Sequence, residues 1–234
     1  MTDKVNSKDL PVISEEIVQR NEFIEIKYTG YANGEIFDSN IDEDIKILNK
    51  ELKGHKIVIA VGEEMVVKGF DKALEGKEVG KDYEIILNPE EAFGKRKREL
   101  VKTIPLNVFR GQKVDPKPGM MFTLDNIMVK VIAVSGARVV ADFNNPLAGK
   151  IIKYKFKIIK KVTEENEKAK ALFQVFFKGV PEFDIKDKIV VRGPKTLEVF
   201  VKVYSNKFKE LMGKALAFEE RKTKKEEEKI NPLQ

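Results

Sequence analysis

The chain of 234 residues contains no Cys and no Trp, and its one His is His55. Without Cys it cannot form a disulfide, bind a metal through thiolates or use a Cys nucleophile. A single His also excludes a metal site built from several His and argues against a His-based triad. The sequence therefore predicts neither a metal nor a cofactor.

Long apolar stretches are missing as well. No run reaches the ~18–20 apolar residues that a membrane-spanning helix needs. Residues 1–20 alternate charged and apolar side chains and lack the continuous apolar core of a secretion signal. We therefore expect a soluble, cytoplasmic protein that does not bind a membrane.

The composition is that of a folded protein with a highly charged surface. Hydrophobic residues make up 42% of the chain, enough for real cores, and its length allows two or three domains. Charged residues reach 35%, which is typical of heat-adapted proteins but also follows from genome base composition. The net charge of +6 would attract acidic partners, but it does not indicate specific nucleic-acid binding.

Alternating apolar and polar residues predict an antiparallel sheet with one buried face. In Ile151–Val162, Ile152, Tyr154, Phe156 and Ile158 point one way and lysines the other. Asn33-Gly34 after the first strand is a hairpin signal, because both turn residues favour positive φ. The fold class expected is α+β, a curved antiparallel sheet wrapped on a short helix at Gly69–Leu74. Its strands would be Glu22–Tyr28, Val58–Val61, Tyr83–Leu87 and Ile151–Val162, and a further helix is expected at Ile41–Leu52.

Two further regions differ in pattern from this sheet. The segment after Gly94 opens with the basic run Lys95–Arg98, interpreted as a solvated hinge, and predicts a small inserted β domain. The last part predicts an α-β-β-α domain with a charged tail. The expected divisions are an N-terminal extension (1–21), a discontinuous main domain (22–94 and 142–162), the insert (95–141) and the C-terminal domain (163–234). The expected elements are strands at Met120–Leu124, Ile127–Val134 and Arg138–Asp142, a helix at Glu164–Phe177, strands at Asp187–Arg192 and Thr196–Val203, and a long helix from Ser205.

Five short segments rich in aromatic residues and glycine occur in order along the chain. None contains an obvious nucleophile, metal-ligand set or phosphate-binding loop, which favours a chemistry that needs none: rotation about an X–Pro peptide bond in an apolar pocket. In this order, with an insert between the last two, they resemble the FKBP family of peptidyl-prolyl isomerases. Within that family they are most similar to SlyD-type and long archaeal members with an insert-in-flap chaperone domain. The segments are Ile26–Tyr31, Gly34–Ser39, Val66–Phe70, Pro89–Gly94 and Asn145–Gly149.

The resemblance implies a catalytic pocket and a client-binding surface. Phe93 stands where the best-known members have a Tyr whose hydroxyl bonds a ligand carbonyl, so only weak macrolide binding is expected. Asn145 stands where SlyD-type members usually have His, and their His-rich tail is missing, so nickel handling is not implied. The implied pocket residues are Tyr28, Phe37, Asp38, Val66, Val67, Phe70, Phe93 and Tyr154. The implied client surface of the insert comprises Met120, Met121, Phe122 and Met128.

Three functions compete at this point. The first is a peptidyl-prolyl isomerase and folding chaperone acting on unfolded or nascent polypeptides that contain proline. The second is a client-binding holdase that has lost useful catalysis; Phe93, in place of the Tyr of the best-known members, favours this function. The third, a ribosome-associated or nucleic-acid-binding factor, depends on the net charge and Lys95–Arg98 alone. Separately, the apolar stripe of the last helix either packs on the C-terminal strands or forms a homodimer; it comprises Phe208, Leu211, Met212, Ala215 and Phe218.

Overall fold

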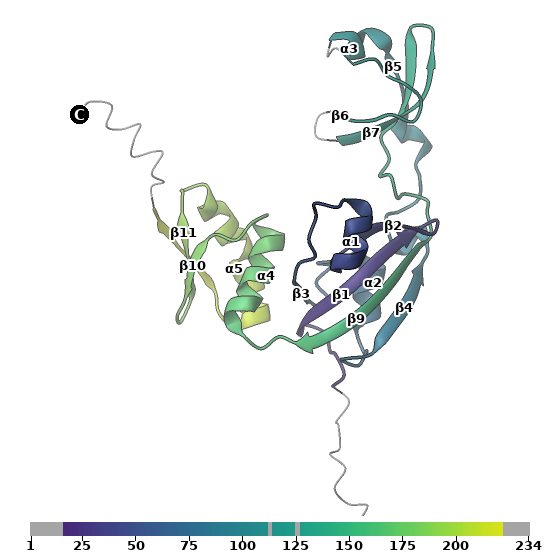
Figure 1. Cartoon of the computed structure of the whole chain (residues 1–234). Helices are drawn as coiled ribbons and strands as arrows, with labels where there is room; N and C mark the ends of the chain where they lie inside the picture. Colours follow the sequence, from purple (N-terminus) through teal and green to yellow (C-terminus); the bar gives the residue numbers. More distant parts are fainter. Residues whose placement is uncertain (1–15, 112–113, 125–126, 222–234) are drawn as a thin grey trace, which may run out of the picture.

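The computed structural model describes residues 16–111, 114–124 and 127–221, and Figure 1 shows their arrangement. Three sheets of five, four and three strands form three parts of the molecule, each with its own cluster of buried apolar side chains. The predicted charged tail, residues 222–229, lies outside the described residues.

The five-stranded sheet is built on the longest alternating segments of the chain. Its order is β2-β1-β9-β4, and β3 pairs with β1 beside β2. All of its pairings are antiparallel, as the alternating pattern predicts. Asn33 and Gly34 have φ of 53° and 83° and turn the chain between β1 and β2, so the hairpin expectation is confirmed. The strands are β1 (Phe23–Ala32), β2 (Glu35–Ser39), β3 (Ile57–Ala60), β4 (Asp82–Leu87) and β9 (Ile152–Lys161).

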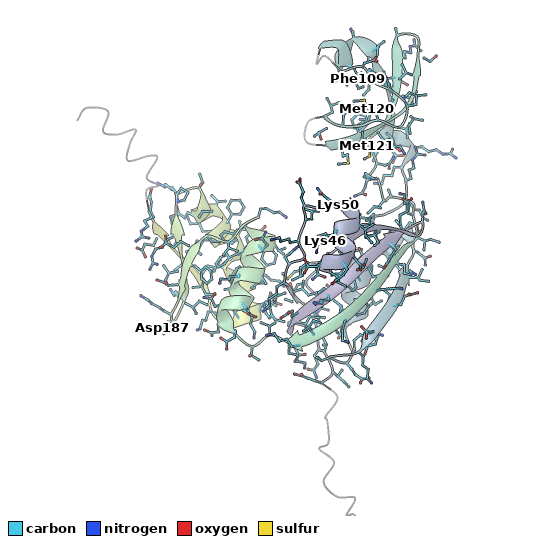
Figure 2. The ribbon with its side chains drawn as sticks, viewed as in Figure 1. Lys46, Lys50, Phe109, Met120, Met121 and Asp187 are labelled. Carbon is cyan, nitrogen blue, oxygen red and sulfur yellow. The ribbon has the colours of Figure 1, made fainter. Side chains whose placement is uncertain are left out.

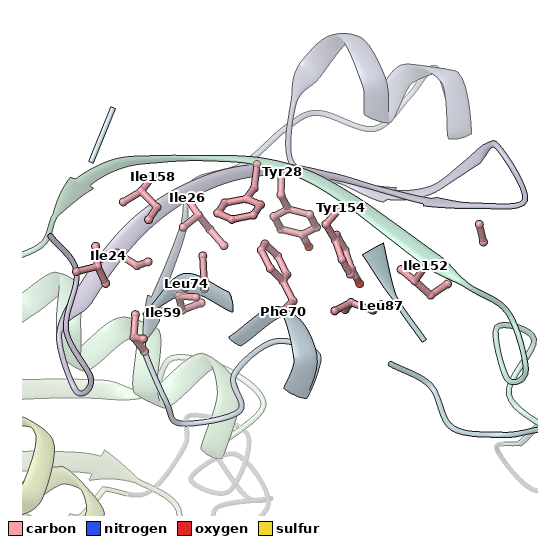
Figure 3. Packing of buried hydrophobic residues seen from close by; sticks show 14 residues of the cluster. Ile24, Ile26, Tyr28, Ile59, Phe70, Leu74, Leu87, Ile152, Tyr154 and Ile158 are labelled. Atoms are coloured by element: carbon pink, nitrogen blue, oxygen red, sulfur yellow. The ribbon is translucent and has the colours of Figure 1, made fainter. Parts of the chain in front are cut away.

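Two short helices accompany this sheet: α1 (Asp42–Leu48) follows β2, and α2 (Lys68–Leu74) lies against the concave face. Phe70 and Leu74 of α2 are 1% and 0% exposed and pack on the buried face of β1 and β9 (Figure 3). Val18, which the sequence places in the N-terminal extension, is also buried in this cluster. Its backbone is held by hydrogen bonds with Gly76 and Lys77.

The four-stranded sheet has the order β5-β8-β7-β6 and stands apart from the first sheet in Figure 1. The three expected strands are present. The sequence analysis missed the fourth, β5, and the short helix α3, whose Phe109 is 3% exposed. Phe109, Val131 and Val139 form the buried centre of this part. Its elements are β5 (Val101–Pro105), α3 (Leu106–Gly111), β6 (Met121–Leu124), β7 (Ile127–Ser135) and β8 (Arg138–Asp142). Two single-turn 3₁₀ helices, Pro89–Glu91 and Arg98–Leu100, precede it.

Hydrogen bonds join the two chain segments that lead into and out of this sheet. Arg96 donates to Asp142 through Nε at 2.9 Å and through a terminal nitrogen at 2.7 Å. The Asn144 side chain accepts from the Lys97 N–H and donates to the Lys97 carbonyl. Burial raises the pKa of Asp142, but hydrogen bonds from Asn144 and Arg96 outweigh it and hold the pKa below its ordinary value. Arg96 is therefore part of a hydrogen-bonded neck, and its side chain remains 51% exposed.

The C-terminal part has the order α-β-β-α-β, not the expected α-β-β-α. The strands Glu182–Ile185 and Leu216–Glu220 were not predicted, and the last helix begins at Leu197 rather than at Ser205. The segment predicted as a second strand, Thr196–Val203, lies mostly in α5, because Leu197, Val201 and Phe208 form one buried helical face. Gly213 ends α5 with φ 71°, and the residues after it form a strand. This strand, β12, pairs in parallel with β11. The elements are α4 (Glu165–Phe176), β10 (Glu182–Ile185), β11 (Ile189–Gly193), α5 (Leu197–Met212) and β12 (Leu216–Glu220).

The core of the C-terminal part continues into the five-stranded sheet. Phe23 of β1, Ala60 of β3 and Val162 belong to the same buried cluster as Leu172 and Phe173 of α4. The apolar stripe predicted on the last helix mostly packs within this cluster, and Phe208 is fully buried. The last helix ends at Met212, so Ala215 and Phe218 of the predicted stripe lie beyond it, and Phe218 belongs to the following strand. The helical part of the stripe packs inward, which favours the first of the two readings. The shared core fixes α4 against β3.

Candidate active site

Three aromatic rings form a buried floor on the concave face of the five-stranded sheet. Phe70 of α2 stacks on Tyr154 of β9, with ring centroids 4.5 Å apart and an angle of 14° between the planes. Tyr28 of β1 meets both rings edge to face, at 5.7 Å and 6.0 Å. Tyr28 is 8% exposed and the other two rings less. These contacts lock the rings and give a rigid apolar surface (Figure 3).

Half-buried side chains surround this floor. Phe37 of β2 packs edge to face on Phe93 at 5.8 Å and on Tyr154 at 5.9 Å. Val66 and Val67, at the start of α2, pack against the same cluster. The structure thus brings together all eight side chains implied for the pocket. They come from segments more than a hundred residues apart in the sequence.

Gly30 and Gly69 are required by close contacts around the floor. A Cβ atom on Gly30 would lie 2.7 Å from the Phe37 ring and 2.8 Å from the Tyr154 ring. A Cβ on Gly69 would lie 2.8 Å from the Glu91 carbonyl oxygen. Glycine at these two positions therefore lets the rings cross β1 and lets α2 approach the Pro89–Glu91 turn.

One polar pair, Tyr28 and Asp38, adjoins the rings. The Tyr28 hydroxyl donates to Asp38 Oδ2 at 2.8 Å. Burial raises the pKa of Tyr28 well above its ordinary value, and the nearby Asp38 carboxylate raises it further. Burial, followed by Asp38, has the same effect on the pKa of Tyr154. Both phenols therefore stay protonated at neutral pH, and the Tyr28 hydroxyl acts as a donor beside a largely apolar surface.

Asp71 and Asn40 hold the backbone around the site, and the sequence analysis missed both. Asp71 is 3% exposed, and its carboxylate accepts the N–H groups of Gly62 and Glu64 at 2.9 Å and 2.7 Å. It thereby fixes the loop that leads to Val66. Asn40, also buried, accepts from the Tyr28 N–H. Asp71 could have been predicted, because it is a charged residue in the apolar face of α2. No local sequence pattern predicts the role of Asn40.

The four residues of the expected client surface divide into two groups. Met120, Met121 and Met128 are 37%, 45% and 52% exposed. Figure 2 shows Met120 and Met121 on the part of the four-stranded sheet nearest the five-stranded sheet in that view. Phe122 instead packs on Phe109 at 5.1 Å in the interior of the sheet's cluster. Its position in that interior argues against Phe122 as part of an exposed surface.

Comparison with known proteins identifies the class. The sequence model described as "FKBP-type peptidyl-prolyl cis-trans isomerase" matches residues 14–110, and the "FKBP26, IF domain" model matches residues 102–147. The chain is 30% identical over 145 residues to the short-type peptidyl-prolyl cis-trans isomerase of Methanocaldococcus jannaschii, covering 61% of this chain and 92% of that protein.

Two bacterial SlyD proteins are also similar. The FKBP-type peptidyl-prolyl cis-trans isomerase SlyD of Helicobacter pylori is 27% identical over 157 residues, which covers 64% of this chain and 78% of that protein. The SlyD of Haemophilus influenzae is 36% identical over 103 residues, covering 42% and 53%. The chain belongs to the FKBP-type peptidyl-prolyl cis-trans isomerases, and it is an enzyme of that class.

The described residues contain neither a membrane-spanning helix nor a metal-binding cluster. No helix in them is long and apolar enough to cross a membrane. Among the same residues, no group of three or more His, Cys, Asp or Glu side chains is arranged to hold a metal ion.

Proposed function

We propose that the ring-lined site on the concave face catalyses rotation about X–Pro bonds in unfolded or nascent polypeptides. The observation that supports this most is the chemical character of the site. A buried floor of stacked rings and a half-buried apolar rim adjoin the hydrogen-bonded pair Tyr28–Asp38. In this proposal Phe37, Phe70, Phe93 and Tyr154 contact the proline ring, and Val66 and Val67 form the wall.

Such a site lowers the rotation barrier without a covalent intermediate. The barrier of ~18–20 kcal/mol comes from amide resonance, whose charge-separated form water favours. An apolar site removes that water, and binding the twisted amide more tightly than either planar isomer lowers the barrier. Lowering it by about 5–6 kcal/mol accelerates rotation on the order of 10⁴-fold. Val67 caps α2, whose first N–H groups have no partner within the helix, so its backbone is placed to donate to a substrate carbonyl.

Catalysis of a short Xaa-Pro peptide tests this assignment. We expect the wild type to accelerate isomerisation, and Asp38→Ala and Phe70→Ala to lower kcat/KM by about tenfold or more, because each removes part of the site. Phe122→Ala is the matched control, since it deletes a ring from a different sheet. Suppression of client aggregation without catalysis would favour the holdase. Phe93 would then be the first residue to test as the cause of the lost catalysis. Equal losses in all three variants would indicate general destabilisation.

We propose that the four-stranded sheet, with its neck, is the insert that holds clients, and that it occupies residues 95–141 between the two segments of the isomerase domain. Its exposed Met121 and Met128, with Ile132, line a groove of about 340 Å³ that continues to Pro146 and Ala148. Gly149, at the end of that loop, donates to the Gly94 carbonyl, next to Phe93. Flexible Met side chains suit a surface that accepts many sequences. A client held there would present its prolines repeatedly to the neighbouring site.

The C-terminal residues 163–234 form the third part of this proposal. A homodimer through this part would use the exposed face of α5, because Phe208, the centre of the stripe first predicted for that role, is buried and most of the stripe packs inward. Val199, Phe200 and Val203 of α5 are 64%, 40% and 64% exposed. Val203→Glu would then shift the chain to a smaller size in sedimentation. An unchanged size in sedimentation would contradict a homodimer through this face of α5.

A further inference from the structure

The outer edge of β3 carries backbone groups that face away from the sheet. Within the described residues β3 pairs with β1 and with no other strand. The Ala60 N–H donates to the sulfur of Met65 at 3.1 Å, so it points away from β1. Because these directions alternate along a strand, the N–H and C=O of Val58 point to the same outer edge. A half-buried Val58 thus offers a donor and an acceptor to an added strand.

Helix α4 stands beside this edge as a fixed wall. Its buried face shares a cluster with Phe23 and Ala60, as described above. At one end, Lys56 next to β3 pairs with Glu167 of α4 at 2.6 Å and with Glu25 of β1 at 3.3 Å. The wall is therefore attached to the sheet by both a core and an ion pair. It does not depend on a bound partner for its position.

Between the β3 edge and α4 lies a groove of about 620 Å³. Its apolar lining comes from β3, from the loop before α2 and from α4, with Ala171 and Val175 on the helix side and Val180 just beyond. Gln174 of α4 adds an exposed amide. Tyr28 and Val66 line the same groove, and both belong to the proposed proline site. The groove is therefore continuous with that site.

We propose that this groove binds the residues on one side of the proline in a polypeptide substrate, in extended conformation along the edge of β3. The inference rests on the proposed function, because the groove extends the same site. The occupant is an extended segment with apolar side chains at alternate positions. Its backbone pairs with Val58, and one set of its side chains packs between Val66 and Val175. The C-terminal part thereby sets which sequences around the proline bind well.

An extended polypeptide fits this groove better than a compact ligand does. β3 spans four residues, about 13 Å, and presents alternating backbone groups along that length. Added strands derive affinity from such main-chain bonds and specificity from pockets for alternate side chains. The lining is mostly apolar; of its charged residues, Lys56 and Glu167 pair with one another at its end, and Lys170 adds one positive charge. A long substrate bound at the proline site would enter the groove without a second binding event.

Peptide length separates the groove from the proline site in an isomerisation assay. One tetrapeptide with a central Leu-Pro is compared with ten-residue peptides that extend it on one side with alternating Val and Thr. The readout is the ratio of kcat/KM for the long peptide to that for the short one. We expect extension on one of the two sides to raise this ratio about tenfold in the wild type, since an apolar side chain becomes buried.

Variants of α4 then locate the gain. Val175→Glu places a charge in the groove and Ala171→Phe fills it, so each should return the ratio to about one. Asn166→Glu adds the same charge to α4 outside the groove and should leave the ratio unchanged. N-methylation of the extension at alternate amides should remove the gain without any change in the protein. This last comparison holds even where a substitution weakens folding.

Four results would overturn the inference. Wild type with no gain from either extension, or Val175→Glu with an undiminished gain, would remove the groove from substrate binding. A gain that appears only after residues 1–15 are deleted would assign the groove to the chain's own N-terminal segment. A change of oligomeric state in Val175→Glu would assign it to a second copy. Absence of tetrapeptide catalysis, or catalysis insensitive to Phe70→Ala, would instead contradict the proposed proline site.

Discussion

At the scale of single residues, the site depends on where large rings are allowed to lie. Tyr154 was assigned to the buried face from the alternation of its strand, and it is 3% exposed. Phe37 crosses β1 because Gly30 has no side chain. The resemblance to a family supplied these roles, since an isolated buried Phe is more often simple core. The resemblance did not predict the hydrogen bonds that Asn40 and Asp71 accept from backbone N–H groups, because these depend on backbone positions that only the folded chain defines.

Phe93 is a residue at which the resemblance to the family implies a difference from its best-known members. It contacts Phe37 edge to face at the half-buried rim, and it has no hydroxyl. Phe93→Tyr should raise macrolide affinity by about tenfold. A hydrogen bond to a ligand carbonyl contributes about 0.5–1.5 kcal/mol, and the upper end of that range corresponds to tenfold in affinity. Calorimetric titration measures it, with Phe122→Tyr as the control. Equal affinity in wild type and Phe93→Tyr would show that the rim ring does not face the ligand.

At the scale of elements, the neck connects two sheets through few but well-oriented bonds. Asp142 accepts from Arg96 and Asn144 while only 9% exposed. Its lowered folded-state pKa means that this carboxylate stabilises the fold above its unfolded pKa and ceases to do so as pH falls through the folded value. The contribution is thus complete at neutral pH and disappears in acid, below about pH 4.

Asp142→Asn should therefore lower the free energy of unfolding by about 1–3 kcal/mol at pH 7, since it removes the charge that orients Arg96. The difference from wild type should shrink as pH falls below about 4. Denaturant unfolding at several pH values measures both effects. Asp82→Asn is the control, because Asp82 is an exposed partner of Lys157 and should change stability much less. A pH-independent difference would mean that the Arg96 pair is not its cause.

The elements also show where pattern reading succeeds and where it fails. Period-two alternation predicted β1 and β9, whose inward side chains pack in one cluster with Phe70 and Leu74 of α2. The strand expected at Thr196–Val203 is instead helical, because Leu197 and Val201 turn inward at helical spacing while Val199 and Val203 are exposed. Local β propensity is a weak preference, and here burial against α4 decides. Gly213, a helix end in the left-handed region, was the overlooked signal for β12.

At the scale of the whole molecule, the three parts are coupled to the five-stranded sheet in different ways. The four-stranded sheet is attached through the narrow neck, whereas the C-terminal part shares a continuous core with β1 and β3. In addition, Lys207 of α5 pairs at 2.5 Å with Glu63, in the loop that leads to Val66. The four-stranded sheet is therefore the part that can be removed with least damage to the proposed catalytic site.

The central claim is that the catalytic site and the client-binding surface are separate. Replacing residues 102–141 with Asn-Gly would join Val101 to Asp142, which pair across the neck, and would keep the Arg96–Asp142 bonds. The decisive measurement compares this variant with wild type on two substrates: a tetrapeptide and a proline-limited refolding protein. The account predicts nearly unchanged tetrapeptide isomerisation and sharply slower refolding catalysis. An equal loss in both assays would contradict the division of labour.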